Sequence, residues 1–280
     1  MNLLNIFITT KIPEDKMKQK NFIILLVFIC LFSVSGYSQY SRSIHKTFDL
    51  KSDGLVFIDT YKGSIIIKTW NKDKVDVQAK IEADDRDEHS EKKVKYTEIN
   101  FDFSRSSLKI KSDYRKIKNK SSSFFKLFSG DTGSLPLVHY TIKMPRTADL
   151  KIKDYKSETE ISNLHSSIDL ETYKGSVEIR SFTGDIALET YKGEATIRFD
   201  KMTDHSTFDT YKGDIEITLP HKTGFDIDLD FGRKVSFRSD FEIPYQPRGK
   251  KDYHYRDEVN GGGNTLKIES YKGDIRIYAK

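Results

Sequence analysis

The sequence contains almost no cysteine: its single cysteine, Cys30, lies in an apolar segment near the N-terminus. A lipid-attachment signal would need small residues just before that cysteine, whereas Phe28 and Ile29 are bulky. We therefore expect the mature chain to contain no disulfide bond, no thiol nucleophile and no cysteine-based metal site.

The sequence also lacks a long apolar run. The apolar segment 21–34 follows a short basic run and precedes small residues, and it is short for a membrane span of about 20 residues. This order is typical of a secretory signal peptide, so we predict a signal over residues 17–38 and an over-extended reading frame over residues 1–16. Cleavage ahead of Gln39 would export the protein to the periplasm, the outer-membrane surface or the extracellular space, without a transmembrane segment in the mature chain. A retained membrane helix is the alternative.

A strong charge of one sign is missing as well. Beyond residue 38 the chain has 43 basic and 40 acidic residues, which leaves a net charge of +3. Nucleic-acid binding needs a concentrated basic face, so we expect no nucleic-acid partner.

No motif of an enzyme or a metal site is present in a supporting context. Asp131-Thr132-Gly133-Ser134 resembles the catalytic loop of an aspartic protease, but it has no apolar strand before it and no second copy. Gly261-Gly262-Gly263-Asn264 lacks the strand and helix of a phosphate-binding loop, and a turn explains it more simply. The G-x-S-x-G elbow is absent, and the seven histidines lack metal-ligand spacing. We therefore predict no enzyme activity, no metal site and no cofactor.

What the sequence has in abundance is repetition. The pentapeptide E-T-Y-K-G occurs at 171–175 and again, eighteen residues later, at 189–193. A variant, Tyr155-Lys156-Ser157, is in phase, and the step after Tyr191 is twenty residues. A fixed internal period of this kind indicates a repeat architecture. The tyrosines of all Y-K-G copies are Tyr61, Tyr173, Tyr191, Tyr211 and Tyr271.

Each repeat unit of nine residues predicts one turn followed by one strand. Apolar residues follow the glycine at alternate positions, as in Gly213-Asp214-Ile215-Glu216-Ile217, which is typical of a strand with one buried side. We expect the glycine to occupy the turn, where φ is often positive and a Cβ would be costly. The predicted turn glycines are Gly63, Gly175, Gly184, Gly193, Gly213 and Gly273.

Two architectures fit units of this length. In an antiparallel meander, spatial neighbours are nine residues apart, whereas in a β-solenoid they are eighteen apart. The copies match far better at eighteen, and stacking like on like explains that identity. We therefore predict an all-β fold, a parallel right-handed β-solenoid with coils of 18–20 residues and an irregular N-terminal β part.

The order of the segments carries a resemblance to a known family. "VHYTIKMPRTADLKIK" (138–153) precedes the main run of repeats, "ITLPHKTGFDIDLDFGRKVSF" (217–237) follows it, and "GGGNTLKIESYKGDIRIYAK" ends the chain. In this order the segments resemble the bacterial putative-adhesin family, a β-helical domain of otherwise unknown function. The resemblance implies an exported, surface-facing and non-enzymatic domain.

We expect the domain organisation to follow the repeats. The resemblance covers most of residues 42–280, which we predict to form a single domain. Its part over 42–145 is expected to be irregular, and its part over 146–280 to consist of regular repeats.

The repeat also predicts a patterned surface. Two positions before each Y-K-G tyrosine lies an acid, with Thr or Ser between them. The acid and the tyrosine would point outward, so stacked coils should display an acid column beside a tyrosine column, with lysines at the corner. A structural role explains such columns, because tyrosines stack and lysines neutralise the carboxylates. The functional interpretation is a stripe that binds a sugar or a polymer, with candidate contacts at Tyr173, Tyr191 and Tyr211.

Two segments, 114–134 and 241–264, break the period. The first is basic and rich in serine, and its candidate contacts are Phe124, Phe125 and Lys126. Long insertions in a regular frame often bind ligands, here an acidic polymer or an anionic membrane surface. Flexible surface loops are the alternative.

Three functional hypotheses follow. The first is a non-catalytic cell-envelope or surface binding module of adhesin type, with a glycan, an acidic polymer or an envelope surface as partner. The second is an enzyme that acts on polysaccharide from one solenoid face. The third is a purely structural or signalling envelope protein. Glycan binding without turnover would separate the first from the second, and a lack of any binding would favour the third.

Overall fold

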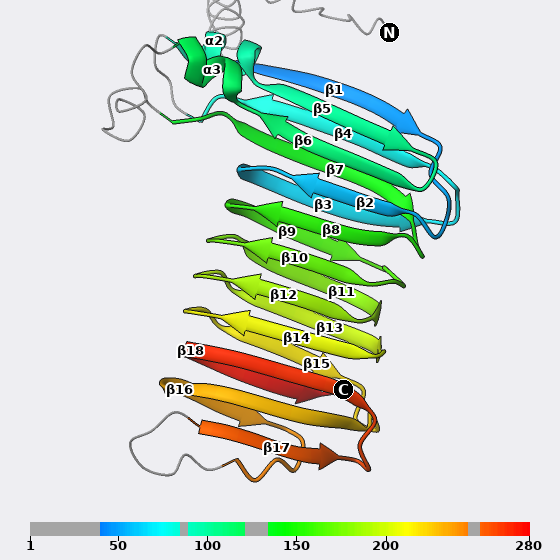
Figure 1. Ribbon diagram of the computed structural model, residues 1–280, viewed down its shortest axis with the longest axis vertical. Coiled ribbons are helices and arrows are strands. Elements are labelled where there is room, and N and C mark those ends of the chain that lie inside the picture. Colours follow the sequence, from blue (N-terminus) through cyan, green and yellow to red (C-terminus); the bar gives the residue numbers. More distant parts are fainter. Residues whose placement is uncertain (1–39, 85–88, 121–133, 246–252) are drawn as a thin grey trace, which may run out of the picture. The chain divides into compact units, whose positions relative to one another are not determined.

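The computed structural model describes residues 40–84, 89–120, 134–245 and 253–280. The chain divides into two compact units, residues 1–39 and 40–280, and all described residues belong to the second. As predicted, the described residues form an all-β fold, with the short helices α2 (Ser90–Tyr96) and α3 (Arg115–Lys120) (Figure 1). The strands are β1 (Ser41–Phe48), β2 (Leu55–Asp59), β3 (Lys62–Trp70), β4 (Val75–Glu82), β5 (Glu98–Ser104), β6 (Ser107–Asp113), β7 (Leu137–Pro145), β8 (Asp149–Asp154), β9 (Lys156–Ser162), β10 (Ile168–Thr172), β11 (Ser176–Gly184), β12 (Ile186–Thr190), β13 (Ala195–Met202), β14 (His205–Thr210), β15 (Ile215–Leu219), β16 (Phe225–Ser239), β17 (Tyr253–Val259) and β18 (Asn264–Ala279).

The alternation of apolar and polar residues explains which side of each strand is buried. In β10, Ile168, Leu170 and Thr172 are buried, whereas the intervening Asp169 and Glu171 are partly exposed. Successive side chains of a strand point to opposite faces, so one face of every such strand faces the core. The inward side chains from both halves of the repeats belong to one hydrophobic cluster.

Copies of the repeat lie side by side as parallel strands. β10 pairs with β12 so that Glu171 is opposite Glu189, and β12 pairs with β14 so that Glu189 is opposite Asp209. The strands after each Y-K-G corner, β11, β13 and β15, pair with one another in the same way. We call the two strands that flank one corner, such as β10 and β11, a rung. Two core columns follow the predicted register: Val177, Ala195 and Ile215; and Ile179, Ile197 and Ile217.

The sheet is mixed, which corrects the prediction of a wholly parallel arrangement. β1 and β7 each pair antiparallel with β4, β5 pairs antiparallel with β6, and β17 pairs antiparallel with β16. These antiparallel pairs lie at the two ends of the stack (Figure 1). The physical reason is that the last rung of a parallel stack exposes unpaired backbone groups, and an antiparallel neighbour satisfies them.

The spatial order of the rungs differs from their order in the sequence. The rung of β2 and β3 lies between β6/β7 on one side and β8/β9 on the other. The single long strand β18 forms both halves of one rung. It pairs with β14 and β15 on one side and with β16 on the other. The first and the last Y-K-G copies are therefore joined to the central ones (Figure 1). The pairing thus links segments across the boundary that the sequence suggested at residue 145.

Candidate functional site

Six tyrosines stack face to face at the Y-K-G corners. The rings of Tyr173 and Tyr191 have centroids 4.6 Å apart and planes 6° from parallel, and those of Tyr191 and Tyr211 are 4.8 Å and 4° apart. The column predicted from the repeat is therefore present. We call the full set the tyrosine ladder; in spatial order it consists of Tyr61, Tyr155, Tyr173, Tyr191, Tyr211 and Tyr271.

A buried threonine hydroxyl closes the corners at Tyr173 and Tyr191. The backbone N–H of Gly175 donates to Thr172 Oγ1 over 3.0 Å, and that of Gly193 donates to Thr190 Oγ1 over 2.9 Å. Ser and Thr commonly stabilise turns in this way, because their oxygen accepts from an amide that the turn leaves unpaired. At these two corners, the residue between the acid and the tyrosine therefore holds the turn that carries the tyrosine.

The corner glycines are required by the stacking of rungs. A Cβ added to Gly193 would lie 2.0 Å from the carbonyl oxygen of Gly175, and one added to Gly213 would lie 1.9 Å from that of Gly193. Neither glycine has a positive φ, so the expected conformational reason does not apply at these corners. It does apply at Gly63, where φ is 135° and a Cβ would also meet the Val138 carbonyl. Of the predicted turn glycines, Gly175, Gly193 and Gly213 lie between strands, whereas Gly63, Gly184 and Gly273 fall within β3, β11 and β18.

The corner lysines contact tyrosine rings. Lys174 Nζ lies 5.4 Å from the centre of the Tyr173 ring, and Lys192 Nζ lies 5.1 Å from that of Tyr191. A cation near an aromatic ring contributes about 0.5–1 kcal/mol at an exposed site. The expected neutralisation of the acid column by these lysines is wrong: within the described part of the chain, no ion pair is formed by Lys174, Lys192, Lys212 or Lys272.

The outward side chains at the strand position of Glu171 form a column, and the sign of their charge follows a different pattern at its two ends. At one end its members alternate in sign: Lys111, Asp59, Lys153 and Glu171 are successive partners. From there on every member is acidic. We call this second stretch the acid column; it consists of Glu171, Glu189, Asp209, Glu269 and Asp230.

Ion pairs neutralise the acid column only in part. Lys153 Nζ lies 2.5 Å from Glu171, and Lys267 pairs with Glu269. Glu189 and Asp209, which lie between those two, are exposed and have no ion pair or side-chain hydrogen bond with any described residue. Partial burial and the negative charge of Glu269 raise the pKa of Asp209.

A groove is bordered by the acid column and the tyrosine ladder. Its volume is about 260 Å³, and it crosses several rungs. Because the tyrosine faces cover one another, a ligand in the groove can reach ring edges and hydroxyls but not the faces of the inner rings. The residues that line it are Lys153, Asp154, Glu171, Thr172, Tyr173, Glu189, Thr190, Tyr191, Asp209 and Tyr211.

Asp154 is an exception at the inner position of a corner. It stands where the neighbouring rungs have threonine or serine, and it is 9% exposed. Its carboxylate accepts hydrogen bonds from Thr172 Oγ1 over 2.6 Å and from the Ser157 N–H over 3.2 Å. Burial disfavours the charged form more than these bonds favour it, and it raises the pKa of Asp154 to about 6.

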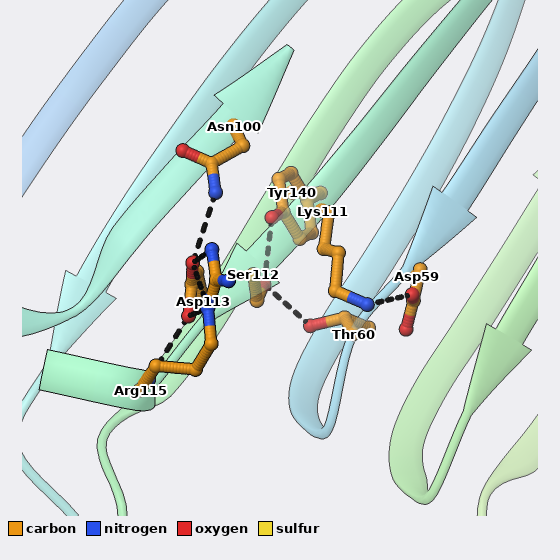
Figure 2. A network of polar contacts seen from close by, with 8 residues as sticks. All are labelled: Asp59, Thr60, Asn100, Lys111, Ser112, Asp113, Arg115 and Tyr140. Carbon is orange, nitrogen blue, oxygen red and sulfur yellow. Dashed lines mark hydrogen bonds and ion pairs between the residues drawn. The ribbon is translucent and has the colours of Figure 1, made fainter. Parts of the chain in front are cut away.

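A polar network lies at the β6/β7 end of the ladder (Figure 2). Ser112 hydrogen-bonds to Thr60 over 2.8 Å and to the Tyr140 hydroxyl over 2.7 Å, and all three residues are buried. Burial raises the pKa of Tyr140, so its hydroxyl stays protonated. These contacts join β2, β6 and β7 at the place where the insertion after Asp113 replaces a Y-K-G corner.

The outer part of this network is ionic. Arg115 Nε donates to Asp113 at 2.9 Å, and Asn100 donates to the same carboxylate at 3.0 Å (Figure 2). The hydrogen bonds from Arg115 lower the pKa of Asp113 to about 2. Lys111 pairs with Asp59 at 2.8 Å. Each charge here has a partner, in contrast to Glu189 and Asp209, so we interpret this network as structural.

The other sequence predictions fall in different places. Phe124, Phe125 and Lys126 lie outside the described residues, as does most of the Asp131–Ser134 loop. Lys116, in the same basic insertion, pairs with Glu98. The glycine run after Asn260 forms a turn, in which the Gly262 N–H donates to the Val259 carbonyl.

Sequence reasoning missed some members of the site. Tyr61, Tyr155 and Tyr271 belong to the ladder although only Tyr173, Tyr191 and Tyr211 were candidate contacts. Their shared motif was the available signal. Asp154 was also missed, and an alignment of the corners would have shown an acid at a threonine position.

Over the described ranges, no cluster of three His, Asp or Glu groups could hold a metal ion. In the same part of the chain, no helix has the length and apolarity needed to cross a membrane.

Comparison with known proteins gives one strong match. The model of the family described as Toastrack DUF4097 matches residues 9–278. No curated protein matches the chain.

Solved structures show weaker similarity. A putative cell adhesion protein from Clostridium sporogenes ATCC 15579 is 14% identical, with 86% of this chain and 100% of that chain covered and a TM-score of 0.46. A putative adhesin from Parabacteroides distasonis ATCC 8503 is 10% identical, with 84% and 97% covered and a TM-score of 0.27. A putative lipid binding protein from the same organism is 10% identical, with 84% and 96% covered and a TM-score of 0.24.

Proposed function

The chain belongs to the Toastrack DUF4097 family, and from this premise we propose that it is a non-catalytic binding module of the bacterial cell envelope, of adhesin type. Its binding surface is the groove between the acid column and the tyrosine ladder. Its ligand is a linear molecule that lies across the rungs, because the groove offers the same groups again at each rung.

The observation that carries this proposal is the change from alternating charges, between Lys111 and Glu171, to the uniformly negative charges of the acid column. Like charges directly opposite each other on neighbouring strands are destabilising, and opposite charges stabilise. The stretch from Lys111 to Glu171 follows the stabilising pattern, whereas the stretch from Glu171 to Asp230 does not. Local departures from stabilising patterns occur at functional sites, where binding compensates for them.

The chemistry of the groove narrows the partner. Carboxylates accept hydrogen bonds from hydroxyl and amino groups, and tyrosine hydroxyls both donate and accept. A glycan or an amine-bearing polymer suits these groups. An acidic polymer would be repelled by Glu189 and Asp209 and is not proposed for this groove.

Two further features belong to the proposal. We infer that the parallel rungs form a right-handed β-solenoid, since parallel crossovers are right-handed in about 98% of cases. We also infer export to the envelope or beyond, on the basis of the signal-like order of residues 17–38.

Binding of the purified full chain to isolated envelope fractions and to a glycan array tests the function. We expect saturable binding that weakens in a Glu189→Gln/Asp209→Asn variant and persists in a Glu160→Gln/Glu178→Gln control, which removes two stacked carboxylates far from the ladder. Mass spectrometry of the bound material should detect no cleavage. Product formation would support the polysaccharide-acting enzyme instead, and a lack of any binding would support a purely structural protein.

A further inference from the structure

The centre of the acid column has two carboxylates that form no ion pair with any described residue. Lys153 neutralises Glu171 and Lys267 neutralises Glu269, whereas Glu189 and Asp209 are exposed and unpaired among the described residues. Partial burial and, after it, the negative charge of Glu269 raise the pKa of Asp209. A positively charged ligand would balance the charge of these two carboxylates.

The other border of the groove favours a ligand with apolar segments. The aromatic rings of Tyr173, Tyr191 and Tyr211 line it beside the carboxylates. Their centroids are 4.6 and 4.8 Å apart, so the edges of the rings form a nearly continuous surface. Methylene groups pack well on such a surface, and their removal from water is favourable. The ligand should therefore alternate cations with short apolar spacers.

The spacing of the rungs selects the length of the spacer. Neighbouring strands lie about 4.8 Å apart, so one carboxylate is offered at about that interval. Two amines joined by three methylenes are about 5 Å apart when the chain is extended, as standard single-bond lengths require. An extended peptide along the groove would present same-face side chains only every ~6.6 Å, which does not match.

We propose that the groove binds a linear aliphatic polyamine, with two consecutive ammonium groups on Glu189 and Asp209 and the methylenes against the ladder. This inference rests on the proposed function, because it places the ligand in the same groove. It adds the chemical class of that ligand. The side chains of Glu189 and Asp209 are its essential contacts. The lysines at the corners contact tyrosine rings and make no described ion pair, so they leave these carboxylates available.

Calorimetric titration of the full chain with norspermidine, whose amines are separated by three methylenes, tests the proposal. We expect binding that weakens roughly tenfold in Glu189→Gln/Asp209→Asn, because this variant loses two exposed charge pairs. The Glu160→Gln/Glu178→Gln control should bind as the native chain does. Affinity should also fall as salt rises, because the contacts are exposed ion pairs.

A second triamine separates matched spacing from simple charge attraction. Bis(5-aminopentyl)amine carries the same charge, but its amines are about 7.5 Å apart, between one and two rungs. We expect it to bind at least about threefold more weakly than norspermidine, a difference of under 1 kcal/mol. Equal affinities for the two triamines, or an equal loss in the control variant, would overturn the proposal.

The test is independent of the proposed function. If norspermidine does not bind while envelope fractions do, the polyamine proposal is wrong and the binding module remains. If norspermidine binds as expected and envelope fractions do not, the ligand class stands and the assignment to an envelope adhesin is wrong.

Discussion

Tyr211 and Tyr271 are sixty residues apart in the sequence, and their rings stack with centroids 5.0 Å apart and planes 2° from parallel. The strand that carries Tyr271, β18, is inserted between the rung of β14 and β15 and the strand β16. The geometry is the same as at Tyr191 and Tyr211, which are close in the sequence. The rungs therefore stack by matching side chains, whether or not the chain connects them directly.

Disulfide cross-linking tests this insertion. In a Cys30→Ser background, Tyr211→Cys with Tyr271→Cys should form a disulfide under mild oxidation, because adjacent strands lie about 4.8 Å apart. Tyr191→Cys with Tyr271→Cys should not, since two rungs separate them by about 9.6 Å. Gel mobility without reductant distinguishes the two outcomes, and efficient bridging of the second pair would contradict the order of the rungs.

The close approach at the corners predicts a strong effect of glycine replacement. Gly193→Val should destabilise the protein by more than about 3 kcal/mol, because the new side chain would overlap the Gly175 carbonyl. Lys192→Ala, one residue away, should cost less than about 1 kcal/mol, because that lysine is exposed. Thermal denaturation measures both, and similar melting temperatures would refute the stacking role of the glycine.

The buried carboxylate of Asp154 predicts a pH-dependent stability. Its pKa is raised from 3.8 to about 6, so the folded state holds this proton more tightly than the unfolded state does. Its contribution is therefore fully present below pH 3.8 and is lost as the pH rises through about 6, a difference of roughly 3 kcal/mol. Asp154→Thr, which restores the residue found in other corners, should abolish this dependence.

Urea denaturation of both proteins between pH 4 and pH 8 measures the effect. We expect the stability of Asp154→Thr relative to the native chain to increase with pH through this window. Asp154→Asn serves as a control for charge alone and should show the same trend. A constant difference at all pH values would mean that Asp154 does not titrate as described.

The acid column predicts opposite effects on stability and binding. Glu189→Lys would restore an alternation of sign beside Glu171 and Asp209, so we expect a gain of roughly 0.2–1 kcal/mol in stability. The same change should weaken envelope binding, because it places a cation in the groove. A variant that loses stability, or that binds as the native chain does, would argue against a functional reason for the uniform charge.

The signal-like segment predicts the start of the mature protein. N-terminal sequencing of the protein from the native envelope should give a start near Gln39. An intact Met17 start would show that the segment is retained. Expression of the chain with Met17 as the first codon should give the same mature product, because residues 1–16 are expected to be dispensable.

Local patterns were sufficient to predict the repeated part of the fold. The alternation after each glycine predicted the strands, and the match at eighteen residues predicted that Tyr173, Tyr191 and Tyr211 form a column. Such features depend on nearest neighbours in a stack, so the period of the sequence contains them. The conformational reason assigned to Gly193 was wrong because the requirement comes from the neighbouring rung.

Other features depend on contacts between distant segments. Nothing in the local sequence distinguishes an insertion of β18 beside β15 from a position at the end of the stack, because each rung offers similar edges to its neighbours. The stacking of Tyr271 on Tyr211 and the position of Glu269 opposite Asp209 follow from that choice.

The sequence by itself determined the all-β character, the register of the central rungs and the outward columns of acid and tyrosine, because these follow from periods of two and eighteen residues. Only the tertiary structure decided which rungs meet at the two ends of the repeat. That decision depends on pairing the edges of strands that are distant in the sequence, such as those beside Tyr61 and Tyr155. It added Tyr61 and Tyr271 to the ladder and Glu269 and Asp230 to the acid column, beyond the central rungs that line the groove.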